Sequence, residues 1–116
     1  MKKYLFVLAL FTTQYAVAAQ LSLAEFKQQT NVHYTELEMK QADLNTALDQ
    51  KQHPDILIEK ACVYSTGLKQ LKTFAQKNQH LKYAQEEFVF VSQLDDSFDR
   101  SIQELGTSYE KSCLNK

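Results

Sequence analysis

Apolar side chains recur at every third or fourth position along most of this sequence, a spacing typical of amphipathic helices. The first such stripe mixes apolar with polar members: Leu23, Phe26, Thr30, His33, Leu37, Lys40, Leu44 and Ala47. Ser22 can cap this helix, and Glu25, three residues later, completes a capping box. The pattern therefore predicts a first helix over residues 22–50.

Two further helices are predicted, each after a short break. Residues 51–55 form the clearest break, because Pro54 biases His53 away from helical backbone and can itself open the next helix. The second stripe consists of Leu57, Ala61, Tyr64, Leu68, Leu71, Ala75 and Asn78. Gly67 interrupts this stripe, so we expect a kink or a close contact with another helix there.

The polar residues 77–80 predict a turn, after which the most regular stripe begins. Its members are Leu81, Ala84, Phe88, Val91, Asp95, Phe98, Ile102, Leu105 and Tyr109. Residues 86–91 have the composition of a strand, but no second run of that kind exists to pair with them, so a helix is favoured. Gly106 predicts a helix end or a bend. Together the three stripes predict an all-α fold, a small antiparallel three-helix bundle.

The N-terminus has the organisation of a secretory signal peptide. Residues 1–3 carry two lysines, residues 4–11 are apolar, and the small residues 16–19 fit an A-x-A cleavage rule. The apolar run is shorter than the roughly 20 residues that span a bilayer, so no stable membrane anchor is expected after cleavage. We therefore expect a signal peptide at residues 1–19, a single helical domain at 20–116, and a periplasmic or secreted location.

The composition of the chain fits one small domain. It has 116 residues, of which 44% are hydrophobic and 11% aromatic, too apolar for a disordered chain. Cleavage after residue 19 would leave eleven Lys and Arg against fourteen Asp and Glu, a net charge of −3. This mildly acidic balance gives no basic signal for nucleic acid or for an anionic membrane surface.

Cys62 and Cys113 are the only cysteines, and such a pair in an exported chain is typical of a structural disulfide. A turn near residue 80 places Cys62 opposite residue 98 of the third helix. Cys113 lies 15 residues further on, about 22 Å along a straight helix, whereas bonded cysteines need Cα atoms within about 7 Å. Either the chain bends back near Gly106, or the turn is misplaced, or the bond joins two molecules. We favour the bend, which ties the C-terminal segment back to the bundle.

Recognisable motifs of catalysis and cofactor binding are missing from the sequence. His33 is predicted to lie within the first helix, and His53 and His80 in loops about 37 Å apart, so the three cannot bind one metal. There is no C-x-x-C-H for haem, no G-x-S-x-G and no H-E-x-x-H, and two glycines cannot make a phosphate loop. We therefore expect no catalytic residue, no metal and no cofactor, and a protein that is not an enzyme.

One acidic cluster of the third helix is a candidate docking surface. Asp95, Asp96 and Asp99 lie within five residues, and Asp95 occupies a position where the stripe calls for an apolar side chain. A carboxylate at such a position needs a partner or water. Phe90 lies off the main stripe and is either an exposed anchor or part of the core. The functional interpretation is a surface for a protein partner with a basic face, and the alternative is a solvated acidic helix face.

Three hypotheses of function fit these features. The first is an exported helical binding protein, such as an inhibitor or immunity protein that masks an exported hydrolase or toxin. The second is a periplasmic chaperone or envelope-stress accessory protein, and the third is a small catalyst whose site no motif reveals. An inhibitor should show one compact charged patch, whereas a chaperone should show exposed apolar stripes and loose packing. The identity of the partner and the oligomeric state stay open.

Overall fold

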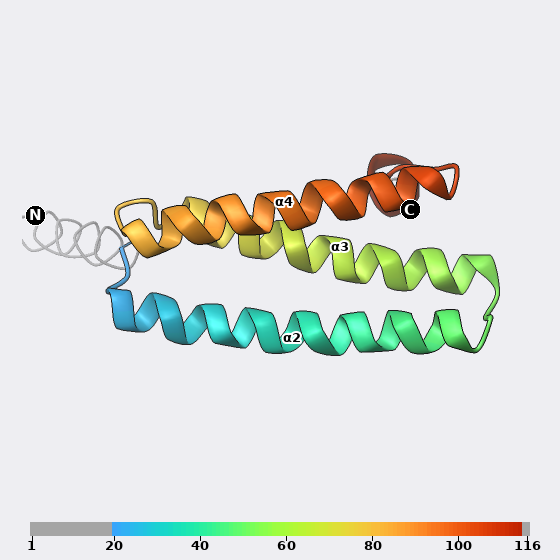
Figure 1. The fold of residues 1–116 in the computed structure, drawn as a ribbon, viewed down its shortest axis with the longest axis horizontal. Helices are drawn as coiled ribbons and strands as arrows, with labels where there is room; N and C mark the ends of the chain where they lie inside the picture. The colour runs from blue at the N-terminus through green and yellow to red at the C-terminus, as the bar shows by residue number, and fades with distance from the viewer. Residues whose placement is uncertain (1–19, 115–116) are drawn as a thin grey trace, which may run out of the picture.

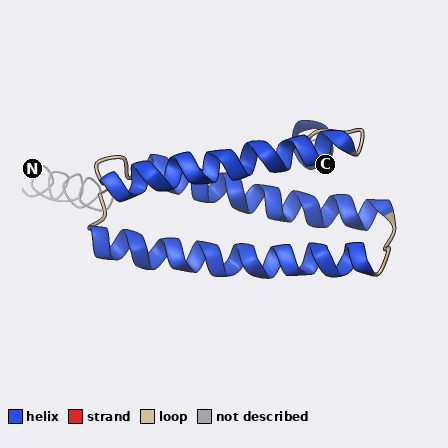
Figure 2. Cartoon of the chain, in the orientation of Figure 1, coloured by secondary structure: helices blue, strands red, loops and turns tan. Residues whose placement is uncertain are grey.

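The helices of the computed structural model, which describes residues 20–114, follow the predicted stripes closely. Helix α2 spans Leu23–Asp49, α3 spans Pro54–Gln76, α4 spans Lys82–Glu104, and a short π-helical turn, η1, follows at Glu110–Leu114 (Figure 1). No strand occurs within residues 20–114 (Figure 2). The all-α fold with three packed helices is confirmed, and so is the helical state of the segment whose composition resembled a strand.

Local sequence signals determine where α2 and α3 begin. Ser22 Oγ accepts a hydrogen bond from the Glu25 N–H at 3.2 Å, and the Glu25 carboxylate accepts one from the Ser22 N–H at 3.1 Å. The predicted capping box is therefore formed, and hydrogen bonding to the backbone and hydroxyl of Ser22 lowers the pKa of the Glu25 carboxyl. At the second helix, Pro54 is the first residue and His53 Nδ1 accepts a hydrogen bond from the Asp55 N–H at 3.2 Å.

Helix α3 is the central element of the bundle, because it packs against both α2 and α4 (Figure 1). The buried core forms two clusters, one of Leu37, Leu68, Leu71 and Val91 and the other of Phe26, Ala75 and Ala84. Phe74 packs against both clusters and stacks on Phe26, with ring centroids 5.0 Å apart. Side chains from all three helices therefore share one core.

Helices α2 and α4 also meet directly in their N-terminal halves. The Tyr34 hydroxyl donates a hydrogen bond of 2.6 Å to the Glu87 carboxylate. Burial, reinforced by this carboxylate, raises the pKa of the Tyr34 hydroxyl. Beside this pair, the Tyr83 ring meets Phe26 edge-on at 6.0 Å, and Lys27 Nζ lies 5.0 Å from the centroid of the same tyrosine ring. These contacts join the two outer helices at the end where both begin.

Gly67 marks a close approach of α3 to α2. A Cβ atom at this position would lie only 2.8 Å from Leu37 Cδ2, a distance that packed side chains do not tolerate. Of the two roles predicted for this glycine, close helix contact is the one that the structure shows.

The chain reverses after α4, as a disulfide between Cys62 and Cys113 requires. Gly106 has a φ of +90°, a conformation that glycine adopts without strain, and it directs the following residues back along α3. Cys113 in η1 bonds Cys62 in α3 with a Cα–Cα distance of 5.4 Å, so the intramolecular disulfide is confirmed. The Tyr109 and Thr66 hydroxyls lie 2.9 Å apart in a further hydrogen bond between the returning segment and α3.

The predicted signal peptide, residues 1–19, lies outside the described residues. Among the helices that the structure describes, none combines the length and the apolar character that crossing a membrane requires. The disulfide agrees with an oxidising, extracytoplasmic environment, in which such bonds persist.

Candidate interaction surface

The acidic residues singled out on α4 form part of a polar cluster with α3. Asp95 is only 3% exposed, and its Oδ1 accepts a hydrogen bond of 2.7 Å from Lys69 Nζ. The same ammonium donates to Asp99 Oδ1 at 3.0 Å, while Lys72 Nζ lies 3.7 Å from the other oxygen of Asp95. The carboxylate that interrupts the apolar stripe has therefore found its partner within the bundle, as burial of a charge requires.

Lys69 is the hub of this cluster. Its Nζ also donates to Ser65 Oγ at 3.3 Å and lies 4.2 Å from the centroid of the Tyr109 ring, a cation–π contact. Burial by itself would lower the pKa of the lysine, but hydrogen bonds to Asp95 and Asp99 outweigh burial and raise it. The ammonium thus connects α3, α4 and the returning C-terminal segment.

This arrangement separates the residues proposed for docking. Asp95 is inside the fold, Asp99 is half-buried against Lys69, and Asp96 is exposed. Phe90 is 52% exposed, so it is not a core residue. It precedes Asp99 by nine residues, which at about 100° per residue places the two on opposite sides of α4. Phe90 and the aspartates are therefore not neighbours in one compact patch.

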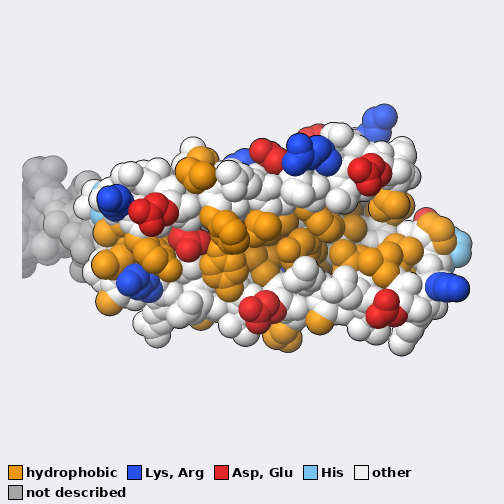
Figure 3. Space-filling view, in the orientation of Figure 1, with side chains coloured by type: hydrophobic (Ala, Val, Ile, Leu, Met, Phe, Trp, Pro, Cys, Tyr) orange, Lys and Arg blue, Asp and Glu red, His pale blue; other side chains and the backbone are white. Residues whose placement is uncertain are grey.

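The structure instead reveals a second apolar stripe on α4, beside the one that faces the core. We use the name α4 stripe for five residues: Tyr83, Phe90, Leu94, Phe98 and Leu105. Their spacings of 7, 4, 4 and 7 put them on one side of the helix. Phe98 is half-buried against Tyr64, whereas the other four are between 36% and 67% exposed. In the space-filling view, hydrophobic side chains gather in a band that runs lengthwise between α4 and α2 (Figure 3).

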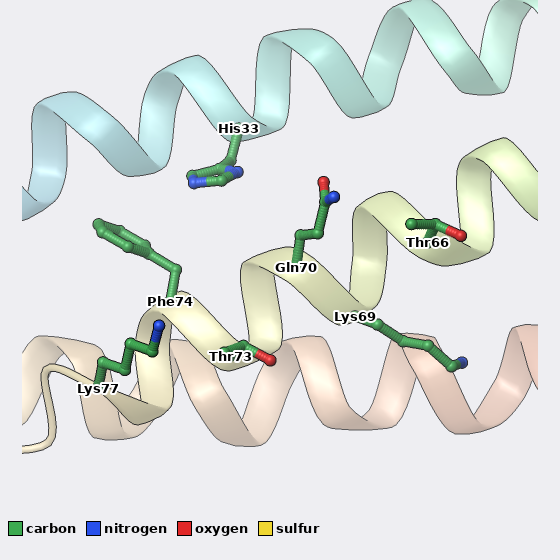
Figure 4. A pocket seen from close by; sticks show the side chains of 7 residues that line it. All are labelled: His33, Thr66, Lys69, Gln70, Thr73, Phe74 and Lys77. Atoms are coloured by element: carbon green, nitrogen blue, oxygen red, sulfur yellow. The ribbon is translucent and has the colours of Figure 1, made fainter.

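A shallow groove of about 510 Å³ lies where α3 borders α2. The His33 ring approaches Phe74 across it, with ring centroids 5.0 Å apart (Figure 4). The remaining lining comes from α3 and is polar: Thr66, Lys69, Gln70, Thr73 and Lys77. No nucleophile in the groove is paired with a general base, and the Lys69 ammonium is already bound by the carboxylates of Asp95 and Asp99. The groove gives no support to a catalytic function.

Two of the histidines make local hydrogen bonds to the backbone. His53 caps α3, and His80 Nε2 lies 2.9 Å from the Leu21 carbonyl oxygen, so that its ring ties the 77–80 turn to the start of α2. Within residues 20–114 no three His, Cys, Asp or Glu side chains gather in a way that could hold a metal ion.

Comparisons with known proteins add no relative. No protein-family model, curated protein or solved structure matches the chain at a significant level.

Of the four exposed members of the α4 stripe, the sequence singled out Phe90 as a possible anchor and placed Leu105 in the core stripe, but it did not identify Tyr83 or Leu94. Tyr83, Phe90 and Leu94 each directly precede a member of the core stripe, so the two stripes adjoin along the helix and form one broad apolar face. Periodicity alone cannot tell which half of such a face the bundle covers.

Proposed function

We propose that the mature chain is an exported, non-enzymatic binding protein whose α4 stripe docks on a protein partner, with Phe90 as the central anchor. An inhibitor or immunity protein that masks an exported hydrolase or toxin is the form of this function that we favour. The observation that carries the proposal is the exposure of Phe90, a large aromatic side chain 52% open to solvent in the middle of an apolar stripe. Aromatic side chains in such positions dominate the binding energy of protein interfaces.

The character of the rest of the bundle supports a binding role. The core is well packed, since Phe26, Leu71 and Val91 are each 0% exposed, and a disulfide holds the C-terminal end. A rigid scaffold of this kind loses little conformational entropy on binding, which favours a single specific partner. The stripe thus belongs to a well-ordered helix.

A periplasmic chaperone is the alternative, and the exposed apolar stripe is the observation in its favour. Chaperones bind many unfolded clients through apolar surface, whereas an inhibitor binds one folded partner. The tight core favours the inhibitor, whereas the exposed apolar stripe and the lack of one compact charged patch around Phe90 favour the chaperone. One experiment can separate the two functions.

Site-specific photo-crosslinking in the envelope of the producing cell tests the proposal. A photoreactive phenylalanine analogue replaces Phe90 in one strain and Met39 in a control strain, since Met39 is 69% exposed on α2. We expect one discrete adduct with another protein from position 90 and none from position 39. A ladder of many adducts from position 90 would support the chaperone, and the same adducts from both positions would refute the stripe as a docking surface. Intact mass of the exported protein shows in the same samples whether residues 1–18 or 1–19 have been removed.

A further inference from the structure

Four charged side chains border the α4 stripe, and their order along the helix is self-complementary. Lys82, Glu86, Arg100 and Glu104 are all exposed, and spacings of 4, 14 and 4 residues place them along one flank of the stripe. None of the four takes part in an ion pair within residues 20–114. Along the helix the four charges alternate as positive, negative, positive and negative. An identical helix that runs antiparallel to the first therefore presents an acidic side chain to each basic one.

We infer that the α4 stripe binds a second copy of this chain, with the two α4 helices antiparallel about a twofold axis centred between Phe90 and Leu94. In this register Phe90 of each copy faces Leu94 of the other. Glu86 then lies beside Arg100 of the second copy, and each of these contacts occurs twice, as twofold symmetry requires.

Two further features agree with the same register. Lys82 lies beside Glu104 of the second copy, so all four flanking charges are paired across the interface. Tyr83 faces Ser101 of the second copy, a large side chain against a small one, which allows the helices to approach. A parallel arrangement would instead put the charged flanks of the two copies on opposite sides of the interface, where the four charges could not pair with one another.

The balance of charge distinguishes a second copy from a lipid surface. Helices that lie on membranes carry an excess of Lys and Arg on their polar side, whereas the flank of this stripe carries two basic and two acidic side chains. One face of a 23-residue helix, about 34 Å long and 10 Å wide, is smaller than the roughly 800 Å² per partner of standard interfaces. We therefore expect a reversible dimer with a dissociation constant in the micromolar range.

The dimer adds a form of regulation to the docking surface. Its biological role rests on the proposed function, because a second copy on the stripe shields Phe90 and Leu94 until a partner displaces it. The existence of the dimer does not depend on the proposed function, since dimerisation is measured on the purified chain with no partner present. A monomer at every concentration would overturn the dimer and leave the crosslinking test unaffected. In the dimer, position 90 crosslinks to a second copy, which the mass of the adduct identifies, so the absence of an adduct with any other protein would leave the dimer unaffected.

Sedimentation equilibrium of the oxidised chain 20–116 tests the inference through charge reversal. Glu86→Arg and Arg100→Glu should each weaken the dimer by about tenfold, because two attractive pairs become repulsive. An equimolar mixture of the two single variants should form a heterodimer at least as stable as the wild-type dimer, since every reversed charge again meets its opposite. The double variant Glu86→Arg/Arg100→Glu should likewise recover wild-type affinity.

Matched alanine variants test the apolar part of the interface. Phe90→Ala should weaken the dimer by about a hundredfold, whereas Val89→Ala should leave it unchanged, because Val89 is 57% exposed but points about 100° away. Thermal unfolding of each variant shows that the bundle is intact. A wild-type chain that stays monomeric, or a dimer indifferent to both charge reversal and Phe90→Ala, would overturn the inference.

Discussion

Replacing Lys69 by methionine would leave the buried carboxylate of Asp95 without its main cation. The ammonium lies 2.7 Å from Asp95 Oδ1 and 3.0 Å from Asp99 Oδ1, and the methionine side chain keeps most of the apolar stem while removing the charge. The variant therefore isolates the electrostatic role of the hub.

The expected loss follows from the burial of the pair. Removing one partner of a buried ion pair costs about 3–5 kcal/mol. Two features reduce this figure here: the Lys69 side chain is 29% exposed, and Lys72 Nζ lies 3.7 Å from Asp95 Oδ2. We expect Lys69→Met to lower the free energy of unfolding by about 2–3 kcal/mol. For a domain of this size that corresponds to a fall in Tm of about 10–20 °C.

Urea unfolding of the oxidised chain, followed by circular dichroism, measures this loss against two controls. Lys72→Met removes the same charge one turn away from a longer contact and should cost less than about 1 kcal/mol. Asp95→Leu should be close to neutral, because leucine suits the apolar stripe and Lys69 keeps Asp99 as its partner. The double variant Lys69→Met/Asp95→Leu should recover most of the stability that Lys69→Met loses.

Two results would refute this reasoning. Equal losses for Lys69→Met and Lys72→Met would show that the short contact to Asp95 has no special role. A double variant less stable than Lys69→Met would show that the aspartate, rather than its unpaired charge, stabilises the bundle.

Three further predictions test the packing. Reducing the disulfide, which closes a 52-residue loop, should lower the free energy of unfolding by about 4 kcal/mol while helical content at low temperature is retained, as denaturant titrations with and without reductant will show. Gly67→Ala should destabilise the chain by about 1 kcal/mol in urea unfolding, because displacing buried Leu37 costs more than the gain in helix propensity; a stabilised variant would contradict the close contact. Tyr34→Phe should cost about 1 kcal/mol by losing the hydrogen bond to Glu87. Folding raises the pKa of the Tyr34 hydroxyl above its usual value near 10. The stability that Tyr34 contributes is therefore complete below that pH and is lost as the pH rises through the folded pKa. In alkaline unfolding curves, the difference in stability between Tyr34→Phe and wild type should accordingly shrink.

The three helices and several of their ends can be predicted from the amino-acid sequence. Capping by Ser22, the break at Pro54 and the helix end at Gly106 are signals within a few residues of the backbone they control, so no tertiary contact is needed to recognise them. The bent-back C-terminus was also predictable, because a covalent bond between Cys62 and Cys113 limits their Cα distance whatever the packing.

Which partner each side chain meets depends on how the helices pack against one another. Asp95 needed a cation, but only the offset between α3 and α4 selected Lys69, and that offset depends on how the side chains of the two helices interdigitate. Exposure of Phe90 was decided in the same way. Its stripe adjoins the core stripe, and α3 and α2 cover one of the two and leave the other open. The sequence of a helix shows how wide its apolar face is, whereas the fraction of that face that is buried depends on where the neighbouring helices pack.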